Sequence, residues 1–153
     1  MSFEMQVGKI KYGDQIENEY TCKGKNLSPE IKWKDPPAST KEIVIFLDDP
    51  DAPKKSFNHW CMRGIQASVS SIHENVPEGE KTEEGWIQLP NDFGKKGYSG
   101  PCPPHNRKHR YFVTLYALVR PIQDSEASNS EALRELCEGL MKKKVTWMFT
   151  YGK

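Results

Sequence analysis

Two aspartates held between prolines are the first residues in this chain that could do chemistry. Asp49 and Asp51 belong to segment 49–53, which reads Asp-Pro-Asp-Ala-Pro and follows an apolar run. Proline fixes its own backbone angle and restricts the residue before it, so both carboxylates are held in place. Such carboxylates can orient a histidine, or they can cap backbone amides in an ordinary turn. Local sequence leaves both interpretations open.

Two histidines could complement these carboxylates. His59 comes 8 residues after Asp51 and begins the pair His-Trp, whereas His109 begins the triplet His-Arg-Tyr. A chain that leaves and re-enters a sheet over so few residues does so near one edge, which favours contact between Asp51 and His59. An aspartate that accepts from one imidazole nitrogen fixes the tautomer and favours the charged ring. Each histidine could instead be a hydrogen-bonded core residue.

The segment 94–104 is a candidate ligand-binding loop. It reads Gly-Lys-Lys-Gly-Tyr-Ser-Gly-Pro-Cys-Pro-Pro. Glycines let backbone amides approach a ligand closely, and the prolines limit the conformers available. A plain surface loop has the same composition, so this segment alone does not establish a site.

Metal binding and nucleophilic catalysis both find little support. His105 and His109 have a spacing seen in zinc sites, but neither a His-Glu-x-x-His nor a Cys-x-x-Cys motif is present. Ser99 and Cys102 lie in a loop without a helix N-terminus to activate them, and there is no Gly-x-Ser-x-Gly elbow. We therefore expect no metal, no cofactor and no catalytic residue, and favour binding over turnover.

Hydrophobic patterning predicts a mainly β chain around these residues. Segment 111–119 is rich in β-branched and aromatic residues without polar alternation, which indicates a central strand buried on both faces. Segment 43–47 is a second such run and ends at Asp48. Further strands are expected at 5–11, 31–34, 60–66, 86–89 and 145–151.

One helix is predicted near the C-terminus. Ser128 and Glu131 have the spacing of a capping box, and apolar residues then recur on one helical face to Met141. The lysines at 142–144 would follow at the helix end, where the dipole favours cations. The segments 48–59 and 91–109 are expected to be long, functional loops. With no repeat or linker, residues 1–153 are expected to form a single domain.

Composition limits the class of protein. Lys and Arg number 22 against 21 Asp and Glu, so the formal net charge is +1 and no nucleic-acid partner is expected. No apolar run approaches the length of a transmembrane helix, and the N-terminus does not resemble a signal peptide, so we expect no stable membrane insertion. The four cysteines are far apart, which favours free thiols in a reduced cytoplasmic setting.

The order of these motifs resembles the phosphatidylethanolamine-binding protein family, in particular its shorter bacterial and archaeal, Raf-kinase-inhibitor-like branch. The resemblance rests on segment 49–53, His59-Trp60, the Asn-Asp-Phe-Gly-x-x-Gly-Tyr-x-Gly-Pro-Cys-Pro-Pro run of 91–104, and 109–111. Segment 20–29 and the ending Thr-Tyr-Gly of 150–152 extend it over nearly the whole chain.

The resemblance implies a fold of two antiparallel sheets with Greek-key topology, and a pocket for phosphate, phosphoethanolamine-like or carboxylate ligands. The residues expected to line this pocket are Asp49, Asp51, Pro53, His59, Gly100, Pro101, His109 and Tyr111. It also implies a cis peptide bond between Ala52 and Pro53, and a homodimer.

From the residues we expect Asp49 and Asp51 to orient and charge His59, while His109, Tyr111 and amides near Gly100 donate to the anion. Two other functions stay open. One is inhibition of a kinase or protease through an exposed loop, and the other is hydrolysis of a small phosphoester.

Overall fold

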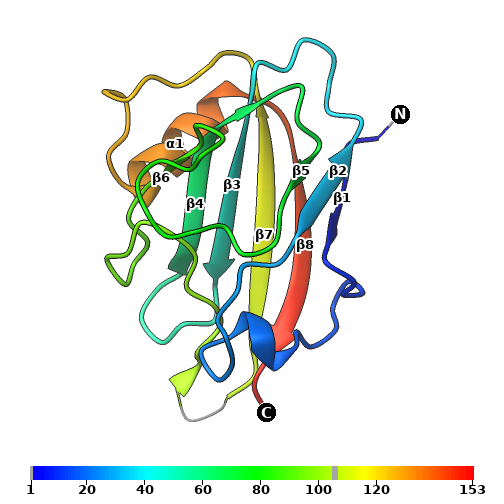
Figure 1. Ribbon diagram of the computed structural model, residues 1–153, viewed down its shortest axis with the longest axis vertical. Helices are drawn as coiled ribbons and strands as arrows, with labels where there is room; N and C mark the ends of the chain where they lie inside the picture. The colour runs from blue at the N-terminus through cyan, green and yellow to red at the C-terminus, as the bar shows by residue number, and fades with distance from the viewer. Residues whose placement is uncertain (1, 105–106) are drawn as a thin grey trace.

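The two long apolar runs of the sequence form neighbouring strands, β3 (Glu42–Asp49) and β7 (His109–Leu118), at the centre of the larger of two sheets (Figure 1). The computed structural model describes residues 2–104 and 107–153. The remaining elements are β1 (Glu4–Val7), η1 (Asn18–Tyr20), β2 (Ile31–Lys34), β4 (Phe57–Gln66), β5 (Ser71–Ile72), β6 (Ile87–Gln88), α1 (Ser130–Leu140) and β8 (Met141–Tyr151).

Both sheets are antiparallel, as expected. The smaller one has the order β1-β2-β5, and the larger one β6-β4-β3-β7-β8. After β4 the chain leaves the larger sheet, adds β5 to the smaller sheet and returns as β6 at the far edge. The larger sheet therefore holds β3 between β4 and β7, where it is paired on both sides.

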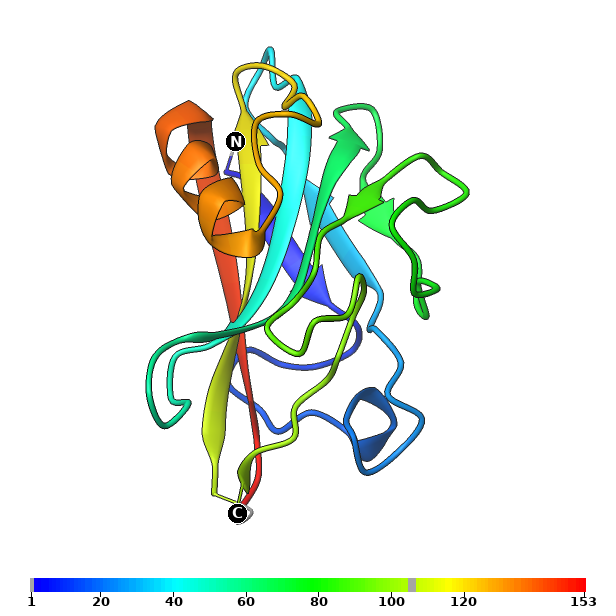
Figure 2. The ribbon, with the colours of Figure 1, turned by 90° about the vertical axis from the view of Figure 1, so that its left-hand side faces the viewer.

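The larger sheet separates two apolar clusters, because successive residues of a strand point to opposite faces. Ile43, Ile45 and Leu47 of β3 pack in the cluster shared with the smaller sheet, whereas Val44 and Phe46 pack in the cluster under α1. Figure 2 shows α1 on one side of the sheet, with β1 and β2 on the other. The expectation of strands buried on both faces is confirmed for β3 and β7.

The predicted helix is present, but its boundaries differ. Asn129 and not Ser128 caps it, because the Asn129 side chain accepts a hydrogen bond from the Ala132 amide at 2.8 Å. The lysines at 142–144 belong to β8 and not to the helix end. Pairing with β7 extends the strand back to Met141, and lysines on an edge strand discourage pairing with other chains.

The expectation of four free cysteines is wrong for two of them. Cys22 and Cys102 form a disulfide, with Cα atoms 5.4 Å apart although 80 positions separate them in the sequence. Cys61 and Cys137 are free and buried in the cluster under α1. The expectation failed because sequence spacing says nothing of which distant segments the fold brings together.

None of the helices formed by residues 2–104 and 107–153 has the length and apolar character needed to cross a membrane.

Candidate functional site

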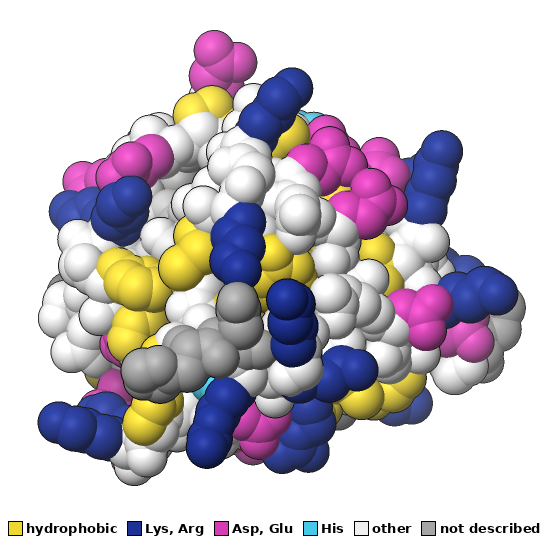
Figure 3. All heavy atoms as spheres, turned by 90° about the horizontal axis from the view of Figure 1, so that it is seen from below, with side chains coloured by type: hydrophobic (Ala, Val, Ile, Leu, Met, Phe, Trp, Pro, Cys, Tyr) yellow, Lys and Arg dark blue, Asp and Glu magenta, His cyan; other side chains and the backbone are white. Residues whose placement is uncertain are grey.

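The ends of β3, β4 and β7 meet around a cavity of about 180 Å³. Figure 3 views the molecule from below Figure 1 and shows Lys and Arg side chains scattered around hydrophobic patches, with histidine reaching the surface only in small areas. The residues that line the cavity are Asp49, Ala52, Pro53, Phe57, His59, Phe93, Cys102, Pro103, Pro104, His109 and Tyr111. Five of the eight residues expected from the sequence are therefore brought together: Asp49, Pro53, His59, His109 and Tyr111.

A buried Asp–His pair forms one wall of the cavity. His109 Nδ1 lies 2.6 Å from Asp49 Oδ2, and the two side chains are only 6% and 5% exposed. A carboxylate accepts, so Nδ1 carries the proton and the ring keeps Nε2 for another partner. Asp49 therefore orients His109, which corrects the expectation that it orients His59. The strand register decides this, because Asp49 ends β3 where β7 begins beside it.

His59 is oriented by the backbone instead. Its Nδ1 lies 2.6 Å from the carbonyl oxygen of Ser99, which can only accept, so this Nδ1 also carries the proton. Burial lowers the pKa of His59, although Asp49 and Asp48 oppose the shift. At neutral pH His59 is therefore uncharged, which corrects the expectation that the two aspartates charge this ring.

A β-bulge directs His59 towards the cavity. On β3, Leu47 pairs with Trp60 and Asp48 pairs with Asn58, so His59 is an extra residue with no partner across the ladder. Trp60 packs in the core cluster between the sheets, while His59 lines the cavity. A bulge of this kind changes the direction of a side chain and bends the strand locally.

Asp51 lies outside the lining of the cavity. Its carboxylate accepts from the Arg110 backbone amide at 2.8 Å and from the Arg110 guanidinium at 3.0 and 2.9 Å. The hydrogen bond from the Arg110 side chain is the main reason that the pKa of Asp51 falls to about 2. Asp51 thus fastens the 50–56 turn to the start of β7.

The Ala52–Pro53 bond is trans, and not cis as the family resemblance implied, since the described residues contain no cis peptide bond. Trans is the usual form of such bonds.

Tyr111 places an unsatisfied polar group at the cavity. The side chain is fully buried, and its hydroxyl has no hydrogen-bond partner among the described residues. Burial also raises the pKa of Tyr111, so the hydroxyl keeps its proton and remains a donor. The ring packs edge-on against His59, with centroids 5.4 Å apart, and stacks on Phe149. A fixed, unused donor of this kind suits a ligand acceptor.

Gly100 and Pro101 support the cavity from behind. The Gly100 amide donates to Asn26 Oδ1 at 2.8 Å, and the Pro101 carbonyl accepts from the Cys22 amide at 3.2 Å. A Cβ atom at Gly100 would lie 2.1 Å from the Tyr20 carbonyl oxygen, so only glycine allows this approach. The loop amide of Gly100 is used within the protein, and is not presented to a ligand.

Sequence reasoning missed the aromatic wall. Phe57 and Phe93 lie with ring centroids 4.7 Å apart, and both contact the ring of His59. Phe93 is 52% exposed, which is unusual for so large an apolar side chain. Phe57 could have been found from its position two residues before His59, because alternate residues of a strand share a face. Phe93 belongs to the Asn-Asp-Phe-Gly part of the family motif, which was the signal that could have found it.

The described residues contain no cluster of three or more histidine, cysteine or acidic side chains arranged to hold a metal ion. His105, which the His-x₃-His spacing pairs with His109, lies outside the described residues.

The fold and site define a β-sheet protein with a small, buried histidine-containing cavity at one end of its central strands. Residues 6–152 match the model of the phosphatidylethanolamine-binding protein family, and the chain belongs to that family.

Curated relatives come from archaea and bacteria. A UPF0098 protein of Methanothermobacter thermautotrophicus is 39% identical over 125 residues, which is 82% of each chain. One from Aquifex aeolicus is 44% identical over 110 residues, which is 71% of this chain but 64% of the relative.

Solved structures show the same fold. A putative phosphatidylethanolamine-binding protein homologue from Chlamydia trachomatis, CT736, superposes with a TM-score of 0.87 at 30% identity, covering 99% of this chain and 98% of that one. YbcL of E. coli, described as a member of the mammalian family, gives a TM-score of 0.88 at 27% identity with the same coverage.

Proposed function

We propose that this chain binds a small anion in the cavity lined by His59 and His109, which we call the histidine cavity. The anion is phosphate, a phosphoethanolamine-like head group or a carboxylate. One observation carries the proposal. Two histidines with fixed Nδ1 donors and a buried, unpartnered Tyr111 hydroxyl line a single cavity of about 180 Å³. That volume suits a phosphate or head group and is too small for a whole lipid with two acyl chains.

The charge on the cavity depends on pH. Because both Nδ1 atoms donate to protein oxygens, a proton taken up by either ring goes to Nε2, which then becomes a donor. For His109, the Asp49 carboxylate balances that positive charge, and an anion on Nε2 receives a charge-assisted hydrogen bond. Exposed Lys54 and Lys108 lie in the segments next to the cavity and attract anions from a distance.

Binding without turnover is the better interpretation. Cys102 lines the cavity, but its sulfur is bonded to Cys22 and is not available as a thiolate nucleophile. Tyr111 retains its proton and acts as a donor rather than a nucleophile. The relatives from Methanothermobacter and Aquifex carry no enzymatic name.

Calorimetric titration between pH 5.5 and 8 tests the proposal, with sulfate as a probe whose charge stays constant over this range, and with phosphate, phosphoethanolamine and acetate. Affinity for sulfate should increase as pH falls, because anion binding and proton uptake at Nε2 favour each other. Asp49→Asn should weaken binding about tenfold by removing the carboxylate that balances His109.

Asp51→Asn is the matched control. It removes the same charge two positions away, from a carboxylate bonded to Arg110 and outside the cavity lining, and should change the affinity less than about twofold. Affinity independent of pH, or equal losses in the two variants, would contradict the proposal. Release of inorganic phosphate from phosphoethanolamine would contradict binding without turnover.

A further inference from the structure

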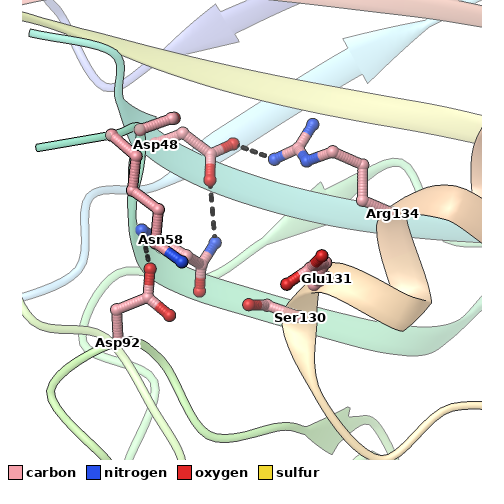
Figure 4. Close-up of a pocket in the computed structure, with 8 residues that line it drawn as sticks. Asp48, Asn58, Asp92, Ser130, Glu131 and Arg134 are labelled. Atoms are coloured by element: carbon pink, nitrogen blue, oxygen red, sulfur yellow. Dashed lines mark hydrogen bonds and ion pairs between the residues drawn. The ribbon is translucent and has the colours of Figure 1, made fainter.

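A second hollow of about 250 Å³ lies on the opposite face of the same strand ends, beside the first turn of α1 (Figure 4). Strand alternation separates the two: Asp48 and Asn58 line this hollow, whereas their neighbours Asp49 and His59 line the histidine cavity. None of the eight lining residues is shared with the histidine cavity. We call this second hollow the helix pocket; its lining residues are Asp48, Lys55, Ser56, Asn58, Asp92, Ser130, Glu131 and Arg134.

One wall of the helix pocket is rigid and electrically balanced. Arg134 forms an ion pair with Asp48, stacks over the Phe46 ring at 4.2 Å from its centroid, and donates to the Tyr116 hydroxyl at 3.3 Å. The two opposite charges cancel locally, and the contacts hold the guanidinium in one position. This wall therefore shapes the helix pocket without giving it a net charge.

Asn58 supplies an unused acceptor. Its side-chain nitrogen donates to Asp48 Oδ1 at 3.0 Å and to the carbonyls of Trp60 and Leu47 at 3.1 and 3.3 Å, which fixes the orientation of the amide. Its oxygen has no partner among the described residues, although Asn58 is only 5% exposed. In Figure 4 this oxygen lies on the side of the amide that faces Ser130. A buried amide oxygen in this position requires a donor.

The opposite side of the helix pocket supplies unused donors. The Asn129 side chain satisfies the Ala132 amide, but within the described part of the chain the amides of Ser130 and Glu131 have no acceptor. The first turn of an 11-residue helix such as α1 also carries a partial positive charge. Lys55 adds a full positive charge at the rim. These groups favour a carboxylate.

Acceptors for a cation stand beside those donors. Asp92 accepts from the Asn58 backbone amide at 2.7 Å through Oδ2, which leaves Oδ1 for another donor, and Glu131 is an exposed carboxylate. Two carboxylates opposed by one lysine and the partial charge of the helix leave the helix pocket only slightly negative. A ligand of high net charge of either sign is therefore disfavoured.

We propose that the helix pocket binds a small zwitterion of the α-amino acid class. Its ammonium group donates to Asn58 Oδ1, Asp92 and Glu131. Its carboxylate accepts from the amides that begin α1 and from Lys55. This site is independent of the anion site proposed above, because its groups lie on the other face of the sheet.

Glycine, methylamine and acetate are the probes, followed by chemical-shift changes of backbone amides at pH 7. Glycine should shift the amides of Asn58, Ser130 and Glu131 saturably, and should bind about threefold or more tightly than methylamine or acetate. Methylamine binding as tightly as glycine would overturn the proposal. Shifts confined to His59, His109 and Tyr111 would overturn it as well, and would leave the anion site unaffected.

Glu131→Gln and Glu135→Gln form a matched pair on α1. Both remove one exposed carboxylate, but Glu135 does not line the helix pocket. Glu131→Gln should weaken glycine binding about three- to fivefold, and Glu135→Gln less than twofold. Lys55→Gln should weaken glycine and acetate but not methylamine. Equal effects of the two glutamate variants would overturn the proposal, even if both fold normally.

Discussion

The hydroxyl of Tyr111 shows at the scale of one residue how a binding site departs from the most stable arrangement. A buried hydroxyl without a partner costs about 1–3 kcal/mol relative to one that is hydrogen-bonded. A phenylalanine would fill the same space without that cost. The hydroxyl is therefore best explained by a ligand that accepts from it, and the two effects can be measured separately.

Tyr111→Phe should leave the free energy of unfolding unchanged or raise it by about 1 kcal/mol, because it removes an unsatisfied polar group. The same change should weaken sulfate binding about five- to tenfold through the loss of one donor. Urea denaturation and calorimetry measure the two effects.

Tyr116→Phe is the control on the same strand. The Tyr116 hydroxyl donates to Glu138 on the helix side, so its loss should reduce stability and leave anion affinity unchanged. The interpretation of Tyr111 fails if Tyr111→Phe destabilises the fold as much as Tyr116→Phe does.

At the scale of elements, the loop that closes the histidine cavity depends on a distant segment. Residues 98–104 supply three lining residues, and this loop is attached to segment 18–26. Tyr98 donates to the Tyr20 carbonyl at 2.6 Å, Gly100 donates to Asn26, and the Cys22–Cys102 disulfide completes the attachment. The loop is therefore held by covalent and polar links, and not only by its own glycines and prolines.

Removing the disulfide should loosen this attachment. The double substitution Cys22→Ser, Cys102→Ser should lower the free energy of unfolding by about 2–5 kcal/mol, as expected for a link that closes a long loop. Anion affinity should fall as well, because Cys102, Pro103 and Pro104 lose their anchor. Urea denaturation with and without dithiothreitol provides the measurement.

The double variant treated with reductant is the control. Its free energy of unfolding should not change, because its remaining cysteines, Cys61 and Cys137, are buried and unpaired. If reductant leaves the natural protein as stable as before, the disulfide does not support the loop.

At the scale of the whole molecule, stability should fall on mild acidification. Burial lowers the pKa of His59 below its ordinary value of 6.5, so the folded state holds fewer protons than the unfolded state just below that pH. The stabilising contribution of neutral His59 is fully present above pH 6.5 and decreases as pH falls towards the folded pKa. Asp51 does not affect this pH range. Its stabilising contribution is lost only below pH 3.8, as the pH approaches its folded pKa of about 2.

Thermal unfolding at pH 5 and pH 7 measures this effect. The midpoint should be lower at pH 5, and the difference should shrink in His59→Gln, which cannot titrate. Saturating sulfate should restore part of the loss, because an anion favours the protonated ring. An equal pH dependence in His59→Gln would show that another group is responsible.

Much of the architecture could be predicted from the sequence. The apolar runs at 43–47 and 111–119 became the central strands β3 and β7, and the helix lies within two residues of its expected start. These features follow from short-range rules: strand and helix periods, and side chains that suit a pleated sheet. The motif order also identified the family and five of the eleven residues that line the cavity.

The sequence by itself determined the central strands β3 and β7 and helix α1 to within two residues of its start, and its motif order identified the family. Only the tertiary structure decided what each of those residues contacts. Asp49 meets His109 across 60 positions rather than the nearby His59, and Cys22 meets Cys102 across 80. Strand alternation places Asp48 and Asn58 in the helix pocket and Asp49 and His59 in the histidine cavity, and the bulge at His59 sets which residues of β4 lie opposite β3. Register is set when whole strands pair and the sheet packs on its core, so a single segment of sequence does not fix these contacts.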